Sequence, residues 1–344
     1  MEHPVSVAKA DRGLSVTVLG GGILGLWQAF ELTGRGHAVT LREAMQEEDT
    51  GAASRFAGAM LAPYCEAEAA EPIVLELGLR GLARWRRSYP GLVARGTLVV
   101  ASARDRAELT RFERLTKGHR RVGAKEIADL EPDLAGRFSD GLFYPDEAHL
   151  SPRAAIGFLI GELRRLGVDL RFGDPAPQPV WMAAAAGEVA IDCRGIAAKD
   201  DLPNLRGVRG EMAVVEADVE LTRPVRLLHP RFPLYVVPWG ERRFMLGATM
   251  IETDDARAVT VRSAFDILSC AVALHPGFAD AAVLELSSGT RPAFPDNIPG
   301  IAIRGRHVMV NGAYRHGFLL APALAEILAD YLETGVAAPG IIRT

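Results

Sequence analysis

Apolar and polar residues near the start of the chain follow first a strand period and then a helical one. Val16 and Val18 flank a polar threonine, as in a buried strand. After a run of glycines, Ile23, Trp27 and Phe30 recur on one helical face, and a second apolar run follows. The pattern predicts a strand, a glycine turn, a helix and a second strand, in that order.

The glycines of this turn fit the spacing G-x-G-x-x-G at Gly20, Gly22 and Gly25. In a dinucleotide site they allow a tight turn, close approach of the pyrophosphate and close helix–strand packing. The helix would direct its N-terminal amides at the pyrophosphate, and Glu43, where the second strand ends, could accept from a ribose hydroxyl. An acid there favours FAD or NAD over NADP. The alternative interpretation is an ordinary α/β turn without a ligand.

A second set of elements fits the same sheet. An apolar stripe predicts a helix over residues 153–166, which ends at Gly167. An alternating strand over 168–172 and an apolar strand over 188–195 follow, and they could extend the first sheet. Simpler patterns predict helices over 73–87 and 103–118 and a strand over 95–102.

The middle of the chain has a different pattern. Residues 208–217, 234–239 and 242–249 read as antiparallel strands, the last two joined by a turn at Gly240-Glu241, and they predict a separate β-rich domain. Near the end, a strand over 307–312, a glycine turn and a helix from about 318 to 332 again place amides where an anion could bind. Residues 51–72, rich in Ala and Gly, form either a plain connection or a loop that lies against something flat.

Composition narrows the class of protein. A chain of 344 residues suits two domains, and 49% hydrophobic with 24% charged residues is typical of a soluble globular protein. A net charge of -4 with mixed signs argues against a nucleic-acid surface, and no apolar run approaches the roughly 20 residues of a membrane span. Residues 1–13 lack an apolar core, so we expect a loose N-terminal extension and not a signal peptide.

Cysteine and histidine usage predicts neither disulfides nor a metal site. The three cysteines are widely spaced without a C-x-x-C pair, and no pair among the eight histidines has ligand spacing. A reducing cytoplasm is the simplest location.

Five stretches together resemble a known family. They are GGGILG with Glu43, then GAASRFAGAMLAP, YVVPWGERRFMLGATM, SSGTRPAFPDNIPGI and NGAYRHGFLLAPALA, in the family's order from residue 15 to about 333. They resemble the flavin-dependent amine oxidases of the D-amino-acid oxidase and glycine oxidase family, most closely the glycine oxidases of thiamine biosynthesis.

The resemblance implies an α/β fold with two domains. A Rossmann-type FAD-binding domain would be assembled from the non-contiguous segments 14–86, 146–204 and 297–344. An α+β substrate domain with an antiparallel sheet would comprise 87–145 and 205–296.

The resemblance also implies an activity. The enzyme would deaminate glycine or a small amino acid oxidatively to its imine by hydride transfer to FAD, with O2 reduced to H2O2, and would feed thiazole formation in thiamine biosynthesis. A D-amino-acid or sarcosine-type oxidase or a dehydrogenase is one alternative, and a non-catalytic FAD-binding partner or redox-sensing module is a lesser one. The resemblance is also compatible with assembly into a homo-oligomer. It is compatible, too, with a hand-off of the product to thiazole-forming enzymes.

Three residues match the substrate side of the family. Arg291, in a GTRP turn, would hold the substrate carboxylate through two parallel hydrogen bonds. Tyr235 would donate its phenol to the same carboxylate, and Arg315 would lie near the flavin and the substrate mouth. The alternatives are a surface arginine, a half-buried strand tyrosine and a C-terminal ion pair, respectively.

The cofactor side of the family gives a larger set. Backbone and helix ends would contact the phosphates and the flavin pyrimidine edge, Met60 and Leu61 would lie by the isoalloxazine, and Gly195 would let the cofactor approach the backbone. The set is Gly20, Gly22, Ile23, Leu24, Gly25, Glu43, Ala53, Ser54, Met60, Leu61, Gly195, Gly312, His316, Gly317, Phe318 and Leu319.

The chain also departs from the family. Ala59 stands where relatives often have glycine, and the shortened stretch 174–189 prevents any transfer of adenine contacts. No cysteine lies near Arg291 or Arg315 in the sequence, so FAD should be bound non-covalently.

Overall fold

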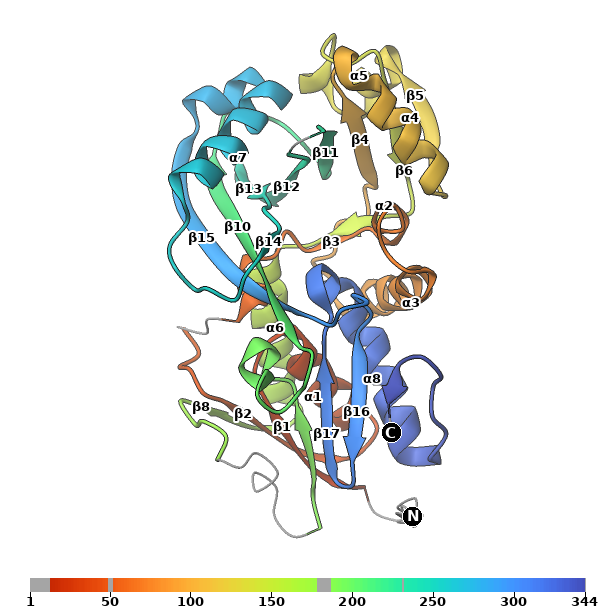
Figure 1. The fold of residues 1–344 in the computed structure, drawn as a ribbon, viewed down its shortest axis with the longest axis vertical. Helices are drawn as coiled ribbons and strands as arrows, with labels where there is room; N and C mark the ends of the chain where they lie inside the picture. The colour runs from red at the N-terminus through yellow and green to blue at the C-terminus, as the bar shows by residue number, and fades with distance from the viewer. Residues whose placement is uncertain (1–12, 49–51, 178–186, 231, 344) are drawn as a thin grey trace.

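The chain folds into two lobes, each built on one large sheet, with the lobes stacked along the long axis (Figure 1). The computed structural model describes residues 13–48, 52–177, 187–230 and 232–343. The predicted N-terminal extension, apart from its last residue, lies outside the described residues.

The lower lobe contains a seven-stranded sheet in the order β18-β16-β17-β9-β1-β2-β8. Neighbouring strands are parallel except β16 and β17, which are antiparallel. The predicted strands β8 and β9 extend the first sheet on either side of the β1–β2 pair, which confirms that part of the prediction. The strands are β1 (Ser15–Leu19), β2 (Ala38–Glu43), β8 (Asp169–Phe172), β9 (Val189–Asp192), β16 (Gly300–Arg304), β17 (His307–Asn311) and β18 (Ile342–Arg343).

Four helices pack in this lobe, namely α1 (Ile23–Gly34), α3 (Pro72–Ser88), α6 (Pro152–Arg165) and α8 (Gly317–Thr334). Helix α1 contacts α6 and α8, and α8 also contacts α3. Trp27 and Trp85, both fully buried, meet edge to face at 4.8 Å between ring centroids. This continuous apolar core fixes the ends of α1 and α8 relative to the sheet.

The upper lobe contains a nine-stranded sheet in the order β14-β10-β13-β12-β11-β4-β6-β5, with β15 paired to β10. The predicted strands near 208, 234 and 242 are β10, β12 and β13, and they are antiparallel as expected. The strands are β4 (Thr97–Ala101), β5 (Arg120–Gly123), β6 (Asp140–Tyr144), β10 (Arg206–Glu216), β11 (Val225–Leu228), β12 (Leu234–Gly240), β13 (Arg243–Gly247), β14 (Ile251–Glu252) and β15 (Ala282–Ala293). The helices of this lobe are α4 (Arg106–Leu115), α5 (Ala124–Leu130) and α7 (Val261–Leu274).

The turn between β12 and β13 corrects the sequence prediction. Gly240 still pairs with Arg243, so the two turn residues are Glu241 and Arg242, not Gly240-Glu241. Both have positive φ, 51° and 60°, as a two-residue hairpin turn of type I′ requires. Gly240 misled the prediction, because the left-handed positions of the turn are filled by two residues that seldom adopt them.

Short elements connect the two lobes. Strand β3 (Met60–Leu61) pairs with β7 (Ala148–His149), and α2 (Pro63–Glu66) follows β3 at the junction between the lobes (Figure 1). Single turns of 3-10 helix complete the fold: η1 (Ala53–Phe56), η2 (Ala103–Asp105), η3 (Pro132–Leu134), η5 (Gly195–Ala198), η6 (Pro276–Asp280) and η7 (Tyr314–His316). Among the helices that the structure describes, none has the length and apolarity to cross a membrane.

Candidate active site

The three motif glycines sit where β1 passes into α1. A Cβ at Gly20 would lie 2.7 Å from the carbonyl oxygen of Cys193, and one at Gly25 would overlap the carbonyl oxygen of Gly20. A Cβ at Gly22, in contrast, would meet nothing nearer than 3.6 Å. The first and third glycines are therefore required by packing, whereas the second borders open space.

That open space lies at the N-terminus of α1. Gly22 is the N-cap residue and has no side chain to cap the helix, and the amide of Ile23 donates one long hydrogen bond, 3.4 Å, to the hydroxyl of Ser54. Helix amides left without a side-chain cap attract an anionic group. The geometry fits the pyrophosphate of FAD.

Glu43 ends β2 beside the same turn. Its carboxylate accepts hydrogen bonds from the amides of Gly21, at 2.5 Å, and Met45, at 3.0 Å. The carboxylate is thus fixed next to the glycine turn, and its role toward a ribose hydroxyl stays a prediction. Leu24 is buried on the first turn of α1.

Asn311 joins two other predicted cofactor residues. Its side-chain amide donates to the carbonyl oxygen of Gly195 and its oxygen accepts from the amide of Gly312, both at 2.8 Å. Both glycines have positive φ, 60° and 76°. Asn311 was not predicted, although an asparagine that ends a strand directly before a glycine was a usable signal.

The N-terminus of α8 approaches that of α1. A Cβ at Gly317 would lie 3.4 Å from the side chain of Ile23. Phe318 and Leu319 have buried side chains, and the carbonyl oxygen of Phe318 accepts from the indole of Trp85 at 2.7 Å. These two side chains serve the core, so any contact with a flavin would come from the backbone amides of the helix.

The loop that leads into β3 lies against the upper sheet. Ala53, in η1, lies under β15, since a Cβ at Gly289 would come within 3.2 Å of its Cα. Met60 packs in one cluster with Tyr235, whereas Leu61 is fully buried. The predicted flavin loop and the predicted substrate tyrosine are therefore adjacent.

Ala59, the departure noted in the sequence, has a φ of 51°. This is the left-handed region that favours glycine, so the backbone keeps a glycine-like conformation although the residue is alanine. The neighbouring Gly58 cannot carry a side chain, because its Cβ would lie 2.8 Å from the ring of Tyr235.

Tyr235, Arg291 and Arg315 line one pocket of about 230 Å³ at the junction of the lobes. Arg291 lies within β15, paired with Val208 of β10, and not in a turn as the sequence suggested. Pro292 is compatible with a strand here because β15 is an edge strand of the described sheet, with β10 on its paired side.

The side chain of Arg291 has a fixed direction. One of its terminal nitrogens donates to the carbonyl oxygen of Thr249 at 3.0 Å. The guanidinium lies directly over Gly210, where a Cβ would overlap it. These contacts hold the half-buried side chain in place, and its role toward a carboxylate stays a prediction. Burial raises the pKa of Tyr235, although Arg291 opposes the shift, so its phenol is protonated and can donate.

Arg315 pairs with Glu66, the last residue of α2, with 2.7 Å between Nε and Oε2. Burial would raise the pKa of Glu66, but Arg315, His316 and Arg226 outweigh it and lower the pKa to about 2. Burial also lowers the pKa of His316 to about 4, so this imidazole is neutral at pH 7. The Nη2 atom of Arg315 is buried and has no hydrogen-bond partner among the described residues, which leaves one donor for a bound group.

Sequence reasoning missed three residues of the pocket region, Glu66, Arg226 and Thr249. Each contacts a residue distant in the sequence, as Glu66 does with Arg315. A single charge or hydroxyl in one sequence carries no signal for such a contact.

One lobe carries the glycine turn at the start of α1, and the arginine-lined pocket contains residues of the sheet in the other lobe. This arrangement is typical of an oxidoreductase that binds a dinucleotide. The chain matches the family of FAD dependent oxidoreductases (DAO) over residues 15–331, and it belongs to that family. Its cofactor is FAD, and the described residues fit it.

The chain is also similar in sequence to individual members of the family. The chain is 49% identical to a Rhizobium etli protein named as a thiamine biosynthesis oxidoreductase, ThiO, over 93% of this chain and 97% of that protein. It is 26% identical to the bifunctional protein ThiO/ThiG of Trichormus variabilis, over 92% of this chain and 52% of that protein.

The glycine oxidase of Geobacillus kaustophilus is 28% identical over 92% of both chains. A crystal structure of glycine oxidase from the same organism has a TM-score of 0.76, with 22% identity and 96% of each chain covered. This structural likeness supports the fold.

Proposed function

We propose that the enzyme oxidises glycine, or a similarly small amino acid, to its imine. The observation that carries the proposal is the pocket in which Arg291, Tyr235 and Arg315 converge beside the Met60 loop. The relatives named as ThiO and glycine oxidase support glycine as the substrate.

The side chains of the pocket bind and orient the substrate. The planar guanidinium of Arg291 would grip the carboxylate through two hydrogen bonds, and the protonated phenol of Tyr235 would donate a third. Arg315, held by Glu66, would supply fixed positive charge near the reacting carbon. Held at the glycine turn, FAD would supply the oxidising chemistry, namely removal of a hydride from Cα and transfer of the electrons to O2 as H2O2.

The imine is the product expected to feed the thiazole ring of thiamine. The bifunctional ThiO/ThiG relative supports a hand-off, because one polypeptide there combines two activities and this chain spans about half of it. The proposed location is the cytoplasm, where a reducing environment suits the free thiols of Cys65, Cys193 and Cys270.

The first test mixes the FAD-loaded enzyme with glycine without oxygen while the visible flavin absorbance is followed. Bleaching, followed by peroxide when air is admitted, supports the proposal. Bleaching with sarcosine or a D-amino acid, but not with glycine, would replace the substrate. A flavin that no amine bleaches would contradict catalysis and favour the FAD-binding module.

Replacement of the anchor gives a second test. Arg291→Ala removes two charge-assisted hydrogen bonds of about 1.5–3 kcal/mol each, so kcat/KM for glycine should fall at least a hundredfold. Arg291→Lys keeps the charge without the fork and should lose less. Arg120→Ala removes an arginine from an exposed pair with Glu126 and serves as the control. A change of less than threefold in Arg291→Ala would refute the anchor role.

A further inference from the structure

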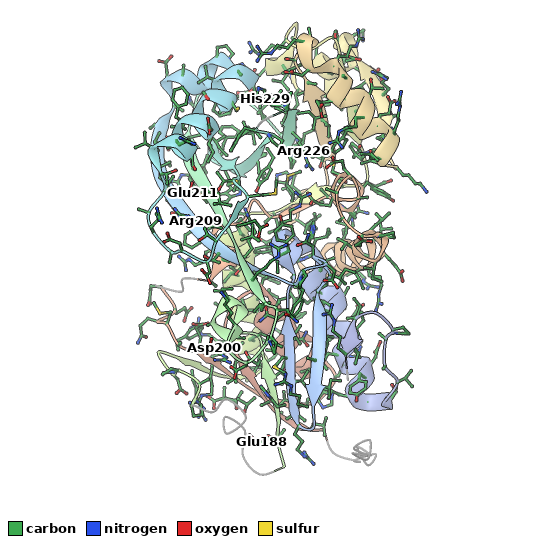
Figure 2. The ribbon with its side chains drawn as sticks, in the orientation of Figure 1. Glu188, Asp200, Arg209, Glu211, Arg226 and His229 are labelled. Carbon is green, nitrogen blue, oxygen red and sulfur yellow. The ribbon has the colours of Figure 1, made fainter. Side chains whose placement is uncertain are left out.

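The pocket contains another buried arginine, Arg226, on β11. It is 8% exposed and lines the same pocket as Arg291 and Arg315. Figure 2 labels it together with His229, which follows the end of the same strand. The reaction proposed above assigns no role to this side chain.

The register of the sheet places Arg226 beside the substrate tyrosine. In the antiparallel pair of β11 and β12, Arg226 lies directly opposite Tyr235. Directly opposite residues share one face of a sheet, with Cβ atoms about 4.5–5.5 Å apart. A single small ligand could therefore contact Arg226 with one group while Tyr235 and Arg291 bind its carboxylate.

The guanidinium of Arg226 is oriented without the use of its donors. Its central carbon lies over the ring of Phe112, 5.1 Å from the centroid. Its nearest carboxylate oxygen, on Glu66, is 3.6 Å away, which is too long for a hydrogen bond. Among the described residues Arg226 donates no hydrogen bond, and cation–π packing leaves its planar fork free.

The neighbouring charges leave this site able to bind an anion. Glu66 is shared by Arg226 and Arg315, and its shorter contact, 2.7 Å, is to Arg315. Two other carboxylates line the pocket, Glu68 and Glu108, but both are paired with Arg111, at 2.5 and 3.3 Å. Arg226 is thus a buried cation of the pocket whose nearest carboxylate is already paired more closely with Arg315.

We propose that Arg226 forms a second carboxylate subsite, and that the enzyme accepts small amino acids that carry a second carboxylate. The inference rests on the proposed function, in which Arg291 and Tyr235 hold the first carboxylate. N-carboxymethylglycine is the simplest such substrate. Both carboxylates stay unchanged while the same carbon is oxidised, so the subsite adds recognition and no chemical step.

A pair of ligands that cannot be oxidised isolates the subsite. Diglycolate and methoxyacetate share one carboxylate and an ether oxygen, and diglycolate adds the second carboxylate. Binding to the FAD-loaded enzyme is measured by the change in the visible flavin spectrum. We expect diglycolate to bind at least about tenfold more tightly, as one charge-assisted contact allows.

Variants assign this preference to Arg226. Arg226→Gln should abolish the preference for diglycolate, and Arg226→Lys should retain part of it. Methoxyacetate binding by Arg226→Gln shows that the first site is intact. Arg111→Gln, which changes an arginine 56% exposed on the same pocket, is the matched control and should keep the wild-type ratio.

Equal affinities in the wild type, or a preference that persists in Arg226→Gln, would overturn the subsite. Failure of the proposed function is seen separately, as a flavin that glycine does not bleach in the same preparation. The ligand ratio is read without turnover, so the two failures are distinguishable.

Discussion

Ala59 illustrates how a single residue shapes the junction between the lobes. Its φ of 51° turns the chain just before Met60, and its carbonyl oxygen accepts from the amide of Leu150 at 3.2 Å. This turn directs β3 toward the cluster that includes Tyr235. The conformation is costly for alanine, because the left-handed region costs an L-residue about 1–2 kcal/mol.

Ala59→Gly should therefore stabilise the protein. The variant no longer has the free-energy cost of a left-handed alanine, which exceeds the cost of ordering the more flexible glycine, about 0.5–1 kcal/mol. The free energy of unfolding should therefore rise by about 0.5–1 kcal/mol. Urea unfolding of the wild type and the variant measures it. Ala62→Gly is the control, since Ala62 is fully buried with a φ of -122° and should only lose stability. A loss of the same size in both variants would contradict this account.

The three arginines of the pocket also show that neighbours decide what an arginine can bind. Arg291 is held by a carbonyl oxygen, Arg315 by a carboxylate and Arg226 by an aromatic ring. Arg291 and Arg315 donate hydrogen bonds to protein groups, whereas Arg226 donates none to the described residues. This difference supports the assignment of the first carboxylate to a firmly oriented fork and the second to a freer one.

At the scale of elements, the short helix α2 depends on a buried carboxylate. Glu147, fully buried between β6 and β7, accepts from the amide of Cys65 at 2.8 Å. Glu66, which follows Cys65 in α2, forms an ion pair with Arg315. Burial raises the pKa of Glu147 to about 7, although the hydrogen bond from Cys65 opposes the shift. The Glu147 carboxyl group, which anchors α2, therefore loses its proton as the pH rises through neutrality.

This shift predicts a pH dependence of stability. Because the folded pKa lies above the ordinary value of 4.5, the contribution of Glu147 is complete below about pH 4.5 and is lost as the pH rises through about 7. Glu147→Gln keeps the acceptor for Cys65 but does not titrate. Between pH 5 and 8 the wild type should therefore lose about 2–3 kcal/mol relative to this variant.

Urea unfolding at both pH values tests the prediction for Glu147. Glu241→Gln, on the exposed hairpin turn, controls for the loss of a carboxylate. A difference between wild type and Glu147→Gln that is the same at pH 5 and pH 8 would show that Glu147 titrates normally.

The elements that the sequence failed to predict share a physical cause. Strand β15 has exposed or half-buried residues along most of its length, with Val283, Leu284 and Leu286 all exposed, so it lacks the alternation that marks a strand. Its GTRP segment was therefore read as a turn. Strands β1, β2 and β9 were predictable because each is apolar and is bounded by glycines or charges.

At the scale of the whole molecule, the candidate site was predictable where local motifs carry it. The glycine turn, Tyr235, Arg291 and Arg315 lie in recognisable stretches, and the structure brings the last three into one pocket. Glu66 and Arg226 meet only because α2 and β11 come together across the fold. Such long-range pairs depend on tertiary packing, which a single sequence does not reveal.

The dinucleotide site should couple the two lobes, because its glycine turn belongs to the lower lobe and its flavin end would face the pocket that contains Tyr235 and Arg291. A ligand that binds only the folded state stabilises it, by about 2.7 kcal/mol at a hundred times Kd. FAD added to the wild-type apoprotein should raise the free energy of unfolding by this amount.

Gly22→Ser separates cofactor binding from folding. Gly22 has a φ of -72° and ample space for a Cβ, and serine is a better N-cap, so the apoprotein should gain a few tenths of a kcal/mol. The serine hydroxyl would occupy the space and the amides that the pyrophosphate needs, so the stabilisation by FAD should largely disappear. Gly25→Ala is the contrasting variant, because its Cβ overlaps the carbonyl oxygen of Gly20 and should destabilise the apoprotein itself. Undiminished stabilisation of Gly22→Ser by FAD would mean that the pyrophosphate does not bind at the start of α1.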